Sequence, residues 1–427
     1  MLWLPGLLVL LGGLPALLRT GQVDPRGWML PALLLIPATA LLKARRGEGA
    51  AWWAGLGTIG AVLSCAFLAS RHVPGLVPVM WFFGVALLAI LAGRQFEGFS
   101  APVKAGGQFR RFNWAPAFAG ARQLVAISLA LLALVACWLA IEPRIKLASG
   151  KRPQLAVVSG LPLFWKEGAS GLAAHVDAPI ITVLRQRFDV RAVDSPLSLQ
   201  RSEAKALLLA QPRAFSMGEL VALNAWIAKG GTALVLADPQ LRWPMDLPLG
   251  DRRRPPAVTL LGPLLEYWGV KLAPLAAGPD ERRHFLGDGR MLTVYAASGF
   301  EGAGPNCRIV GRGLIARCTV GKGVAIVVAD ADLVDDRLWL TDPVKPLHPD
   351  RWTADTPQFV AQALGGALPE GRHWVRTADD LIRAVRWAVL VGLFWAGLGM
   401  PLFLRPGRTR FALTVAPDDR PKPEMED

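Results

Sequence analysis

Apolar residues gather toward the two ends of this chain. Several long apolar runs lie in the first third and another lies near the C-terminus, whereas the sequence between them looks like that of a soluble domain. A helix that crosses a bilayer needs about 20 consecutive, mostly apolar residues. The runs that reach or approach this length are Leu2–Leu18, Trp28–Leu42, Ala50–Ser70, Leu76–Ala92, Leu124–Ile141 and Val385–Leu404. We therefore expect six membrane spans, of which Trp28–Leu42 is the shortest.

This distribution divides the chain into four parts. Residues 1–141 are a membrane region with five spans, residues 142–383 a separate domain, residues 384–404 a last span, and residues 405–427 a tail. Lys and Arg are concentrated in the loops Lys43–Gly49 and Gly93–Arg122 and in the tail from Arg405. Loops rich in Lys and Arg stay in the cytoplasm. We expect a multi-pass protein of the cell inner (plasma) membrane, surrounded by lipid, with both termini cytoplasmic and residues 142–383 extracytoplasmic.

Residues 142–383 alternate short β-rich runs with helical patterns. The expected strands are Leu155–Ser159, Asp189–Val193, Ala206–Ala210, Thr232–Ala237, Met291–Ala296 and Val324–Ala329, with a hairpin at Arg308–Arg317 and helices at Ala173–Phe188, Ser216–Lys229 and Thr356–Leu364. In the helix from Ser216, this serine occupies the N-cap and Glu219 the capping-box position. Strand–helix–strand order predicts a parallel sheet covered on both faces. The expected fold class is α/β, an open α/β sandwich with a mixed sheet.

Two of the expected strands end in carboxylates. Asp238 follows Thr232–Ala237, and Asp330 and Asp332 follow Val324–Ala329. In open α/β sheets, ligands bind beyond the carboxyl ends of the strands. Asp238, Asp330 and Asp332 are therefore the candidate ligand-binding residues. The alternative is that these side chains cap the following turns and helices, as aspartate commonly does.

The four cysteines fall into two groups. Cys65 and Cys137 lie within apolar spans, where packing explains them. Cys307 and Cys318 flank the expected hairpin, whose turn is Gly311–Gly313. If that region lies outside the cytoplasm, a cross-strand disulfide is one interpretation and two free thiols are the other.

The net charge of +14 raises the question of nucleic-acid binding. Much of this charge lies beside the apolar runs, at Lys43, Arg45, Arg46, Arg94, Lys104, Arg110, Arg111, Arg122, Arg405, Arg408 and Arg410. Membrane orientation accounts for positive charge in these places. We expect no nucleic-acid partner.

The sequence lacks the motifs of common catalytic sites. Between Cys137 and Cys307 there is no cysteine to act as a nucleophile, and no serine has the G-x-S-x-G flanks of a hydrolase. The five histidines are scattered, and there is no P-loop. Gly55-x-Gly57-x-x-Gly60 resembles a dinucleotide fingerprint but lies in an apolar run with no preceding strand. We expect no catalytic residue, no metal site and no cofactor.

Two segments resemble a known family. Ala206–Pro239 reads ALLLAQPRAFSMGELVALNAWIAKGGTALVLADP, and Gly321–Asp336 reads GKGVAIVVADADLVDD. They resemble the auxiliary domain of ABC-type transport systems, the GldG-like proteins, in which a strand, a helix and a GG-x-x-L-V-L-x-D-P strand recur. Departures from the family pattern are Ala329 for a glycine, Ala331 for a serine and Leu333 for an aromatic residue.

The resemblance implies a non-catalytic module with a class I glutamine-amidotransferase-like fold and flavodoxin-like layering. It also implies an ABC ATPase and permease subunits as partners. From it we expect a non-enzymatic inner-membrane protein that serves an ABC-type transport system through its extracytoplasmic domain. Two alternatives stay open, a membrane-anchored envelope hydrolase or amidase and a ligand-binding scaffold or sensor.

Overall fold

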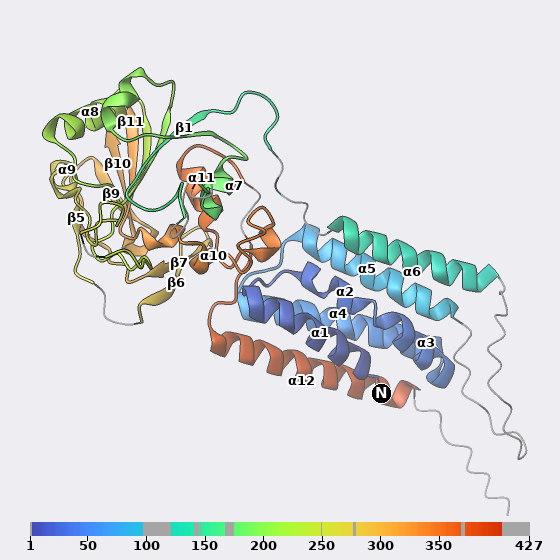
Figure 1. Ribbon diagram of the computed structural model, residues 1–427. Coiled ribbons are helices and arrows are strands. Elements are labelled where there is room, and N and C mark those ends of the chain that lie inside the picture. Colours follow the sequence, from blue (N-terminus) through green and yellow to red (C-terminus); the bar gives the residue numbers. More distant parts are fainter. Residues whose placement is uncertain are drawn as a thin grey trace, which may run out of the picture.

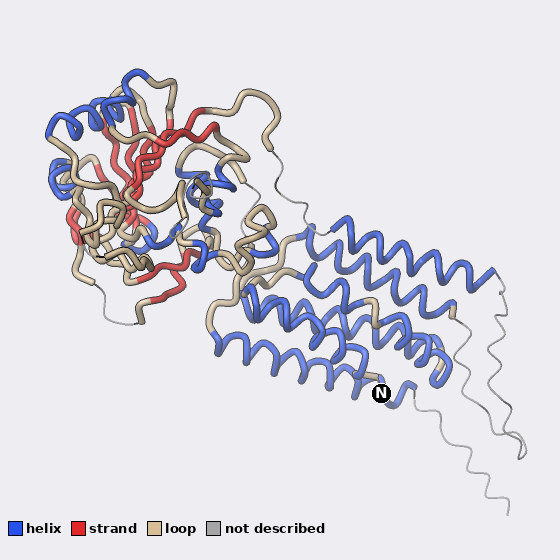
Figure 2. The backbone as a smooth tube through the Cα atoms, viewed as in Figure 1, coloured by secondary structure: helices blue, strands red, loops and turns tan. Residues whose placement is uncertain are grey.

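The protein consists of a helical bundle and an α/β domain that lie end to end (Figure 1). The computed structural model describes residues 2–96, 121–140, 145, 147–166, 175–248, 250–275, 279–368 and 372–403. In Figure 2 the strands lie in one part of the molecule and the long helices in the other. Both ends of the described chain belong to the bundle, and the α/β domain is inserted between its last two helices.

The bundle is built from the apolar ends of the chain. Its helices are α1 (Leu4–Thr20), the 3-10 turn η1 (Pro25–Trp28), α2 (Met29–Ala32), α3 (Leu35–Arg46), α4 (Glu48–Ser70), α5 (Leu76–Gln95), α6 (Ala121–Ala140) and α12 (Ala378–Phe403). Among the described residues, four helices are long and apolar enough to cross a membrane: α4, α5, α6 and α12. Four of the six expected spans are thus confirmed as long apolar helices.

The other two expected spans differ from the prediction. The run from Trp28 to Leu42 is broken, because η1–α2 and α3 meet at an angle of 54°. Pro37 lies in the first turn of α3 and has no N–H to continue a hydrogen-bond ladder from the preceding residues. The first helix, α1, has 17 residues and is shorter than α4, α5, α6 and α12. Length and composition therefore support four spans, or five if the bent pair counts as one, so the sidedness inferred from six spans stays a prediction.

Small residues let the helices of the bundle approach closely. The indole rings of Trp53 on α4 and Trp395 on α12 stack with centroids 4.2 Å apart. Each indole N–H donates to the backbone oxygen of the other tryptophan, at 2.9 and 2.8 Å. A Cβ atom at Gly57 would lie 2.4 Å from the Trp395 ring, and one at Gly399 would lie 2.4 Å from Trp53. The glycines of the Gly55-x-Gly57 pattern therefore serve helix packing, as a membrane-helix interpretation requires.

The α/β domain is organised around a seven-stranded sheet. In sheet order the strands are β2 (Asp189–Ala192), β1 (Gln154–Ser159), β3 (Ala206–Ala210), β4 (Thr232–Leu236), β11 (Gly323–Val328), β10 (Ile315–Val320) and β9 (Cys307–Val310). The first five are parallel, β10 is antiparallel to β11, and β9 is antiparallel to β10 and so runs in the direction of the first five. The mixed sheet and its principal strands are confirmed. Smaller two-stranded sheets pair β5 (Lys271–Leu272) with β8 (Phe300–Gly302) and β6 (Glu281–Phe285) with β7 (Met291–Tyr295).

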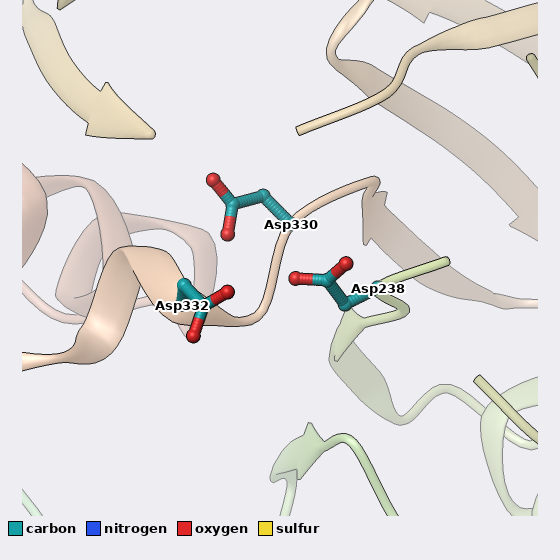
Figure 3. A group of neighbouring side chains, drawn as sticks. All are labelled: Asp238, Asp330 and Asp332. Carbon is teal, nitrogen blue, oxygen red and sulfur yellow. The ribbon is translucent and has the colours of Figure 1, made fainter. Parts of the chain in front are cut away.

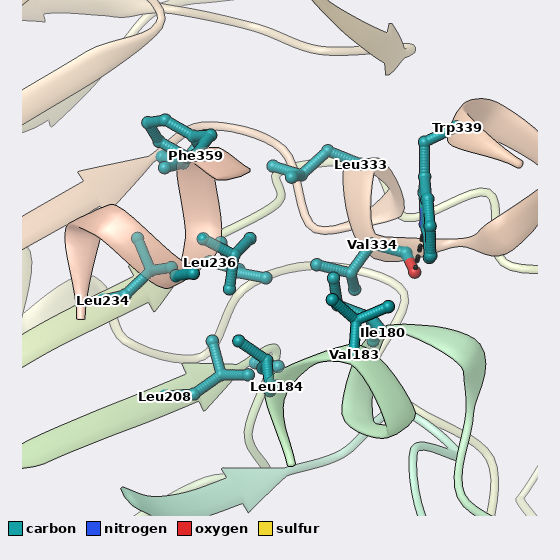
Figure 4. Packing of buried hydrophobic residues seen from close by; sticks show 14 of the residues in the cluster. Ile180, Val183, Leu184, Leu208, Leu234, Leu236, Leu333, Val334, Trp339 and Phe359 are labelled. Carbon is teal, nitrogen blue, oxygen red and sulfur yellow. Dashed lines mark hydrogen bonds between the residues drawn. The ribbon is translucent and has the colours of Figure 1, made fainter. Parts of the chain in front are cut away.

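Helices cover both faces of the sheet, as the all-apolar strands require. One face packs against α7 (Pro179–Leu184), α10 (Asp336–Trp339) and α11 (Thr356–Ala363), and the other against α8 (Met217–Ala228) and α9 (Gly262–Tyr267). On β3, Leu208 enters the first core, whereas its neighbours Leu207 and Leu209 enter the second. Figure 4 shows the first core, with Leu208 and Leu236 facing side chains of α7 and of the turn after β11.

One expected helix is much shorter than predicted. The run Ala173–Phe188 forms a helix only over α7, Pro179–Leu184. Ala178 is extended (φ −58°, ψ 152°), because a residue before proline is driven out of the helical region. The start of the predicted run, Ala173 and the residue after it, lies outside the described residues. By contrast, α8 agrees with its prediction, including the reciprocal capping box of Ser216 and Glu219.

Backbone hydrogen bonds join the bundle to the domain. The Val23 N–H donates to the His373 carbonyl at 2.7 Å, and the Val375 N–H donates to the Gly21 carbonyl at 2.9 Å. The segment after α1 thus pairs with the segment before α12. We call residues 21–24 and 372–376 the junction.

Side chains strengthen the junction. The Gln22 amide donates to the carbonyls of Pro349 at 2.9 Å and Trp352 at 2.7 Å, both in the α/β domain. The Arg376 guanidinium lies over the Phe285 ring, 4.0 Å from its centroid. The α/β domain is therefore connected to the bundle by backbone and side-chain contacts at the junction as well as by the covalent chain.

Candidate functional site

Three aspartates meet at the carboxyl edge of the large sheet (Figure 3). Asp238 follows β4, and Asp330 and Asp332 follow β11, the strand beside β4. One carboxylate oxygen from each lies within 4.8 Å of the others. The structure therefore brings together all three predicted site residues, which we call the aspartate triad. Adjacent parallel strands produce this arrangement, because their carboxyl ends lie at the same edge.

Asp238 and Asp330 use all their carboxylate oxygens to hold backbone N–H groups. Asp238 accepts from the N–H of Gln240 at 2.7 Å and of Ala331 at 3.0 Å. Asp330 accepts from the N–H of Leu333 at 3.0 Å and from Tyr295, at the end of β7, at 2.9 Å. These bonds fasten the loops after β4, β7 and β11 to one another.

Only one of the two carboxylate oxygens of Asp332 accepts a hydrogen bond from the described residues. Its Oδ2 accepts from the N–H of Arg242 at 2.7 Å, in the loop after β4. Its Oδ1 is buried and has no hydrogen-bond partner within the described residues. A buried carboxylate oxygen without a donor is costly when the group is charged, so this oxygen is the natural place for a proton.

Burial and mutual repulsion raise the pKa of all three carboxyl groups. Burial raises the pKa of Asp332 to about 7, with a smaller contribution from Asp238. Burial, then the charges of Asp238 and Asp332, raises the pKa of Asp330 well above its ordinary value. Burial also raises the pKa of Asp238, against the backbone N–H groups that lower it. Asp332 therefore carries a proton in part of its population near neutral pH.

The triad is closed to solvent. The exposed fractions of Asp238, Asp330 and Asp332 are 0%, 0% and 2%. Three carboxylates of this spacing have the chemistry to hold a divalent cation once they lose their protons. A larger ligand has no path to them, and the backbone bonds favour the capping interpretation over a ligand contact.

Gln211, which the sequence interpretation missed, supports Asp238 from behind. Its side-chain oxygen accepts from the Asp238 N–H at 2.9 Å, and its amide donates to the Asp238 carbonyl at 3.1 Å. Gln211 has a φ of 43°, which is uncommon for a residue with a side chain. The sequence does carry a signal for this role, because Gln211 is a polar residue that follows β3 much as Asp238 follows β4.

Cys307 and Cys318 form a disulfide across β9 and β10. The two residues are opposite each other in the antiparallel register, and their sulfur atoms are 1.97 Å apart. The other two cysteines, Cys65 and Cys137, are free and buried in the bundle. Of the two interpretations of this pair, the structure shows the disulfide.

An open cavity of about 500 Å³ lies on the sheet face near the start of β10, away from the triad. Its floor is apolar and its charged lining consists of Asp288, Arg290 and Arg317. Arg290 pairs with Asp288 and donates to the Gln362 side chain at 2.7 Å. Sequence reasoning missed this cavity, although Arg317 is a charged residue on the sheet face that otherwise carries Ile315.

Comparison with protein families gives one assignment within the α/β domain. Residues 152–278 match the family described as an ABC-type uncharacterized transport system, ABC_transp_aux. The matched segment runs from β1 past β5 and contains Asp238. No curated protein matches the chain. An auxiliary domain of an ABC-type transport system is therefore supported for this segment.

Solved structures give only distant similarity. A cytoplasmic protein from Salmonella typhimurium LT2 is 12% identical with a TM-score of 0.28, over 42% of this chain and 88% of its own. The exo-beta-1,4-mannosidase Op5Man5 from Opitutaceae bacterium strain TAV5 is 11% identical with a TM-score of 0.28, over 64% of this chain and 39% of its own. A beta-galactosidase from Rahnella sp. R3 is 13% identical with a TM-score of 0.28, over 58% and 35%. Scores this low support no argument about fold or function.

Proposed function

We propose that this chain is a non-enzymatic, inner-membrane component of an ABC-type transport system, in which a GldG-like α/β domain outside the cytoplasm binds a partner protein or an envelope ligand. The observation that carries the proposal is the family match over residues 152–278. An ABC ATPase and permease subunits are the partners that this assignment implies.

The surface of the bundle supports a place in the membrane. Its outward side chains are apolar over long stretches, including Leu131 and Trp138 on α6 and Leu393 and Phe394 on α12. Contiguous apolar surface of this kind is rare on soluble proteins, because water does not favour it. A bilayer would cover it.

The aspartate triad supports a non-enzymatic role. Its carboxylates are bonded to backbone N–H groups and are closed to solvent, so they meet no substrate. A general acid or base must come within hydrogen-bond reach of the group that reacts. The three aspartates that the sequence predicts as site residues thus serve to hold loop backbones together.

The junction supports a role in which the domain and the bundle act together. Backbone pairing and the buried Gln22 side chain connect the domain to the bundle. A displacement of the domain, caused by a force or by ligand binding, would therefore be transmitted to α1 and α12. Such a connection suits a subunit that works beside a membrane transporter.

Co-purification tests the proposal. The full chain, tagged and extracted from its own cells in a mild detergent, should bring down an ATPase and a permease subunit identified by mass spectrometry. The control is an unrelated multi-span protein with the same tag at similar abundance. Recovery of neither subunit above this control contradicts the proposal.

The cavity beside Arg290 and Arg317 favours a second candidate, a ligand-binding sensor. Its volume of about 500 Å³ and its combination of apolar floor and arginines suit a small apolar molecule with an anionic group. A rise in the melting temperature of the full chain with octanoate, absent in Arg317→Gln, would support this candidate. Equal melting temperatures with and without octanoate would count against it.

A further inference from the structure

Two cavities adjoin at the end of the bundle that meets the domain. The larger, about 220 Å³, lies between the last turn of α1, the segment from Gln22 to Trp28, the end of α6, and the domain residues Asp350 and Arg372. The smaller, about 140 Å³, is lined by Arg26, Gly27, Met29, Leu30, Cys137 and Ala140. Arg26, Gly27 and Ala140 line both cavities, so the two lie side by side.

The two cavities differ in chemistry. The larger, which we call the head cavity, has three arginines in its lining, Arg19, Arg26 and Arg372, against two aspartates, Asp24 and Asp350. The smaller, which we call the tail cavity, has an apolar lining apart from Arg26. The head cavity thus has one net positive charge, and its Asp24 pairs with Arg26 and lies 3.9 Å from Arg372. A cationic cavity beside an apolar one matches a molecule with an anionic head and a hydrocarbon chain.

Two of the arginines are held in place. Arg26 donates to both carboxylate oxygens of Asp24, at 2.5 to 3.1 Å. Arg372 donates to the Gln22 side chain at 2.8 Å, and only 8% of its side chain is exposed. Fixed guanidinium groups bind an oxyanion with little further loss of conformational freedom.

The third arginine is available to an added anion. Arg19, in the last turn of α1, is exposed and makes no ion pair with any described residue. Its guanidinium can turn toward an oxyanion in the head cavity without first breaking an ion pair with a carboxylate.

The tail cavity lies at the outside of the bundle, because Leu30 in its lining is 57% exposed. α2 contacts both α1 and α6, the helices whose ends line the two cavities. In a bilayer the tail cavity would face acyl chains, and the head cavity would lie at the level of the lipid headgroups.

We propose that this site binds one phospholipid with an anionic headgroup. The phosphate contacts Arg19 and Arg26 in the head cavity, and an acyl chain follows Leu30 and Cys137 through the tail cavity. The inference rests on the membrane location given under the proposed function. Because Arg372 belongs to the domain and Arg19 to the bundle, a bound headgroup stabilises the junction between them.

Lipid addition to the full chain tests the site. The protein is purified in a neutral detergent, then given phosphatidylglycerol, phosphatidylcholine or glycerol 3-phosphate, and examined by native mass spectrometry and thermal unfolding. We expect one retained phosphatidylglycerol and a higher melting temperature, with about tenfold weaker binding of phosphatidylcholine. Glycerol 3-phosphate should have no effect. Equal binding of the two lipids overturns the headgroup claim, and an equal effect of glycerol 3-phosphate identifies a soluble-anion site and overturns the lipid.

Substitutions locate the binding. Arg19→Gln should weaken phosphatidylglycerol binding about tenfold, because it removes one charged contact to the phosphate. Ala140→Leu should weaken the binding of both lipids, because Ala140 lines both cavities and a larger side chain would occupy part of their space. The matched control is Arg386→Gln, an exposed arginine in the first part of α12, which should bind like the unaltered chain. Unchanged binding by Arg19→Gln overturns the site.

Carbonate extraction of the same cells separates this inference from the proposed function. A chain that carbonate releases from membranes contradicts the membrane location itself. A chain that stays in the membrane but shows no preference between lipids contradicts only the lipid site.

Discussion

At the scale of single residues, the three aspartates of the triad have the clearest effect on the stability of the fold. Three carboxyl groups lie together in the interior, and burial pushes the pKa of each upward. An aspartate whose pKa is higher in the folded chain than in the unfolded chain stabilises the fold while it is protonated. That contribution is complete below the unfolded pKa of about 3.9 and is lost as the pH rises through the folded pKa.

For Asp332, whose pKa is raised to about 7, this loss takes place between about pH 4 and pH 7. We predict that the free energy of unfolding decreases over this range, by up to about 1.4 kcal/mol per pH unit, and levels off above about pH 7. Asp332→Asn should remove this part of the slope, because an amide does not titrate. Denaturant unfolding of the full chain across this pH range measures both. A slope that is unchanged in Asp332→Asn contradicts the assignment.

Asp238 should be much more sensitive to truncation than an exposed aspartate. Asp238→Ala leaves the N–H groups of Gln240 and Ala331 without their acceptors in the interior, which should cost about 2–4 kcal/mol of stability. The control is Asp194→Ala, since Asp194 is exposed and follows β2 in the same way. Denaturation midpoints of the two variants give the comparison. Similar midpoints would show that the triad does not fasten the loops.

Among the elements, α8 shows most clearly what the local sequence contributes. Ser216 and Glu219 cap each other's backbone, and Glu219 also accepts from the Ser195 hydroxyl at 2.6 Å. We predict that Ser216→Ala costs about 1 kcal/mol, the usual value of a serine N-cap. Ser198→Ala, at an exposed position, should cost little. Thermal unfolding of the two variants measures the difference, and equal melting temperatures would contradict the capping role.

The secondary-structure elements also show what could and could not be predicted from the sequence. Strongly apolar β3 and β4 and the capped α8 were predictable, because their signals are local. β6 was not predicted, since its sequence ERRHF carries charge and it pairs only with β7. The triad's proximity followed from neighbouring parallel strands. Its closure did not, because the N–H groups of Tyr295 and Arg242 bond to Asp330 and Asp332, which are 35 and 90 residues away in the sequence.

At the scale of the whole molecule, the junction decides whether the two parts move together. Gln22→Ala removes two hydrogen bonds to domain carbonyls. We predict faster hydrogen exchange at the amides of Val23 and Val375, which pair across the junction. The control is Gln186→Ala, whose side chain bonds only within its own helical turn. Exchange at Val23 and Val375 that matches the control would show that Gln22 does not maintain the junction.

The position of the α/β domain outside the cytoplasm is the claim on which partner and ligand both depend. Arg252→Cys introduces a thiol on an exposed loop of the domain, and Ala44→Cys introduces one at the opposite end of the bundle, while the native cysteines are bridged or buried. A membrane-impermeant maleimide applied to intact spheroplasts should label Arg252→Cys at once and Ala44→Cys only after permeabilisation. The reverse pattern, with the domain labelled only in opened cells, would contradict the account.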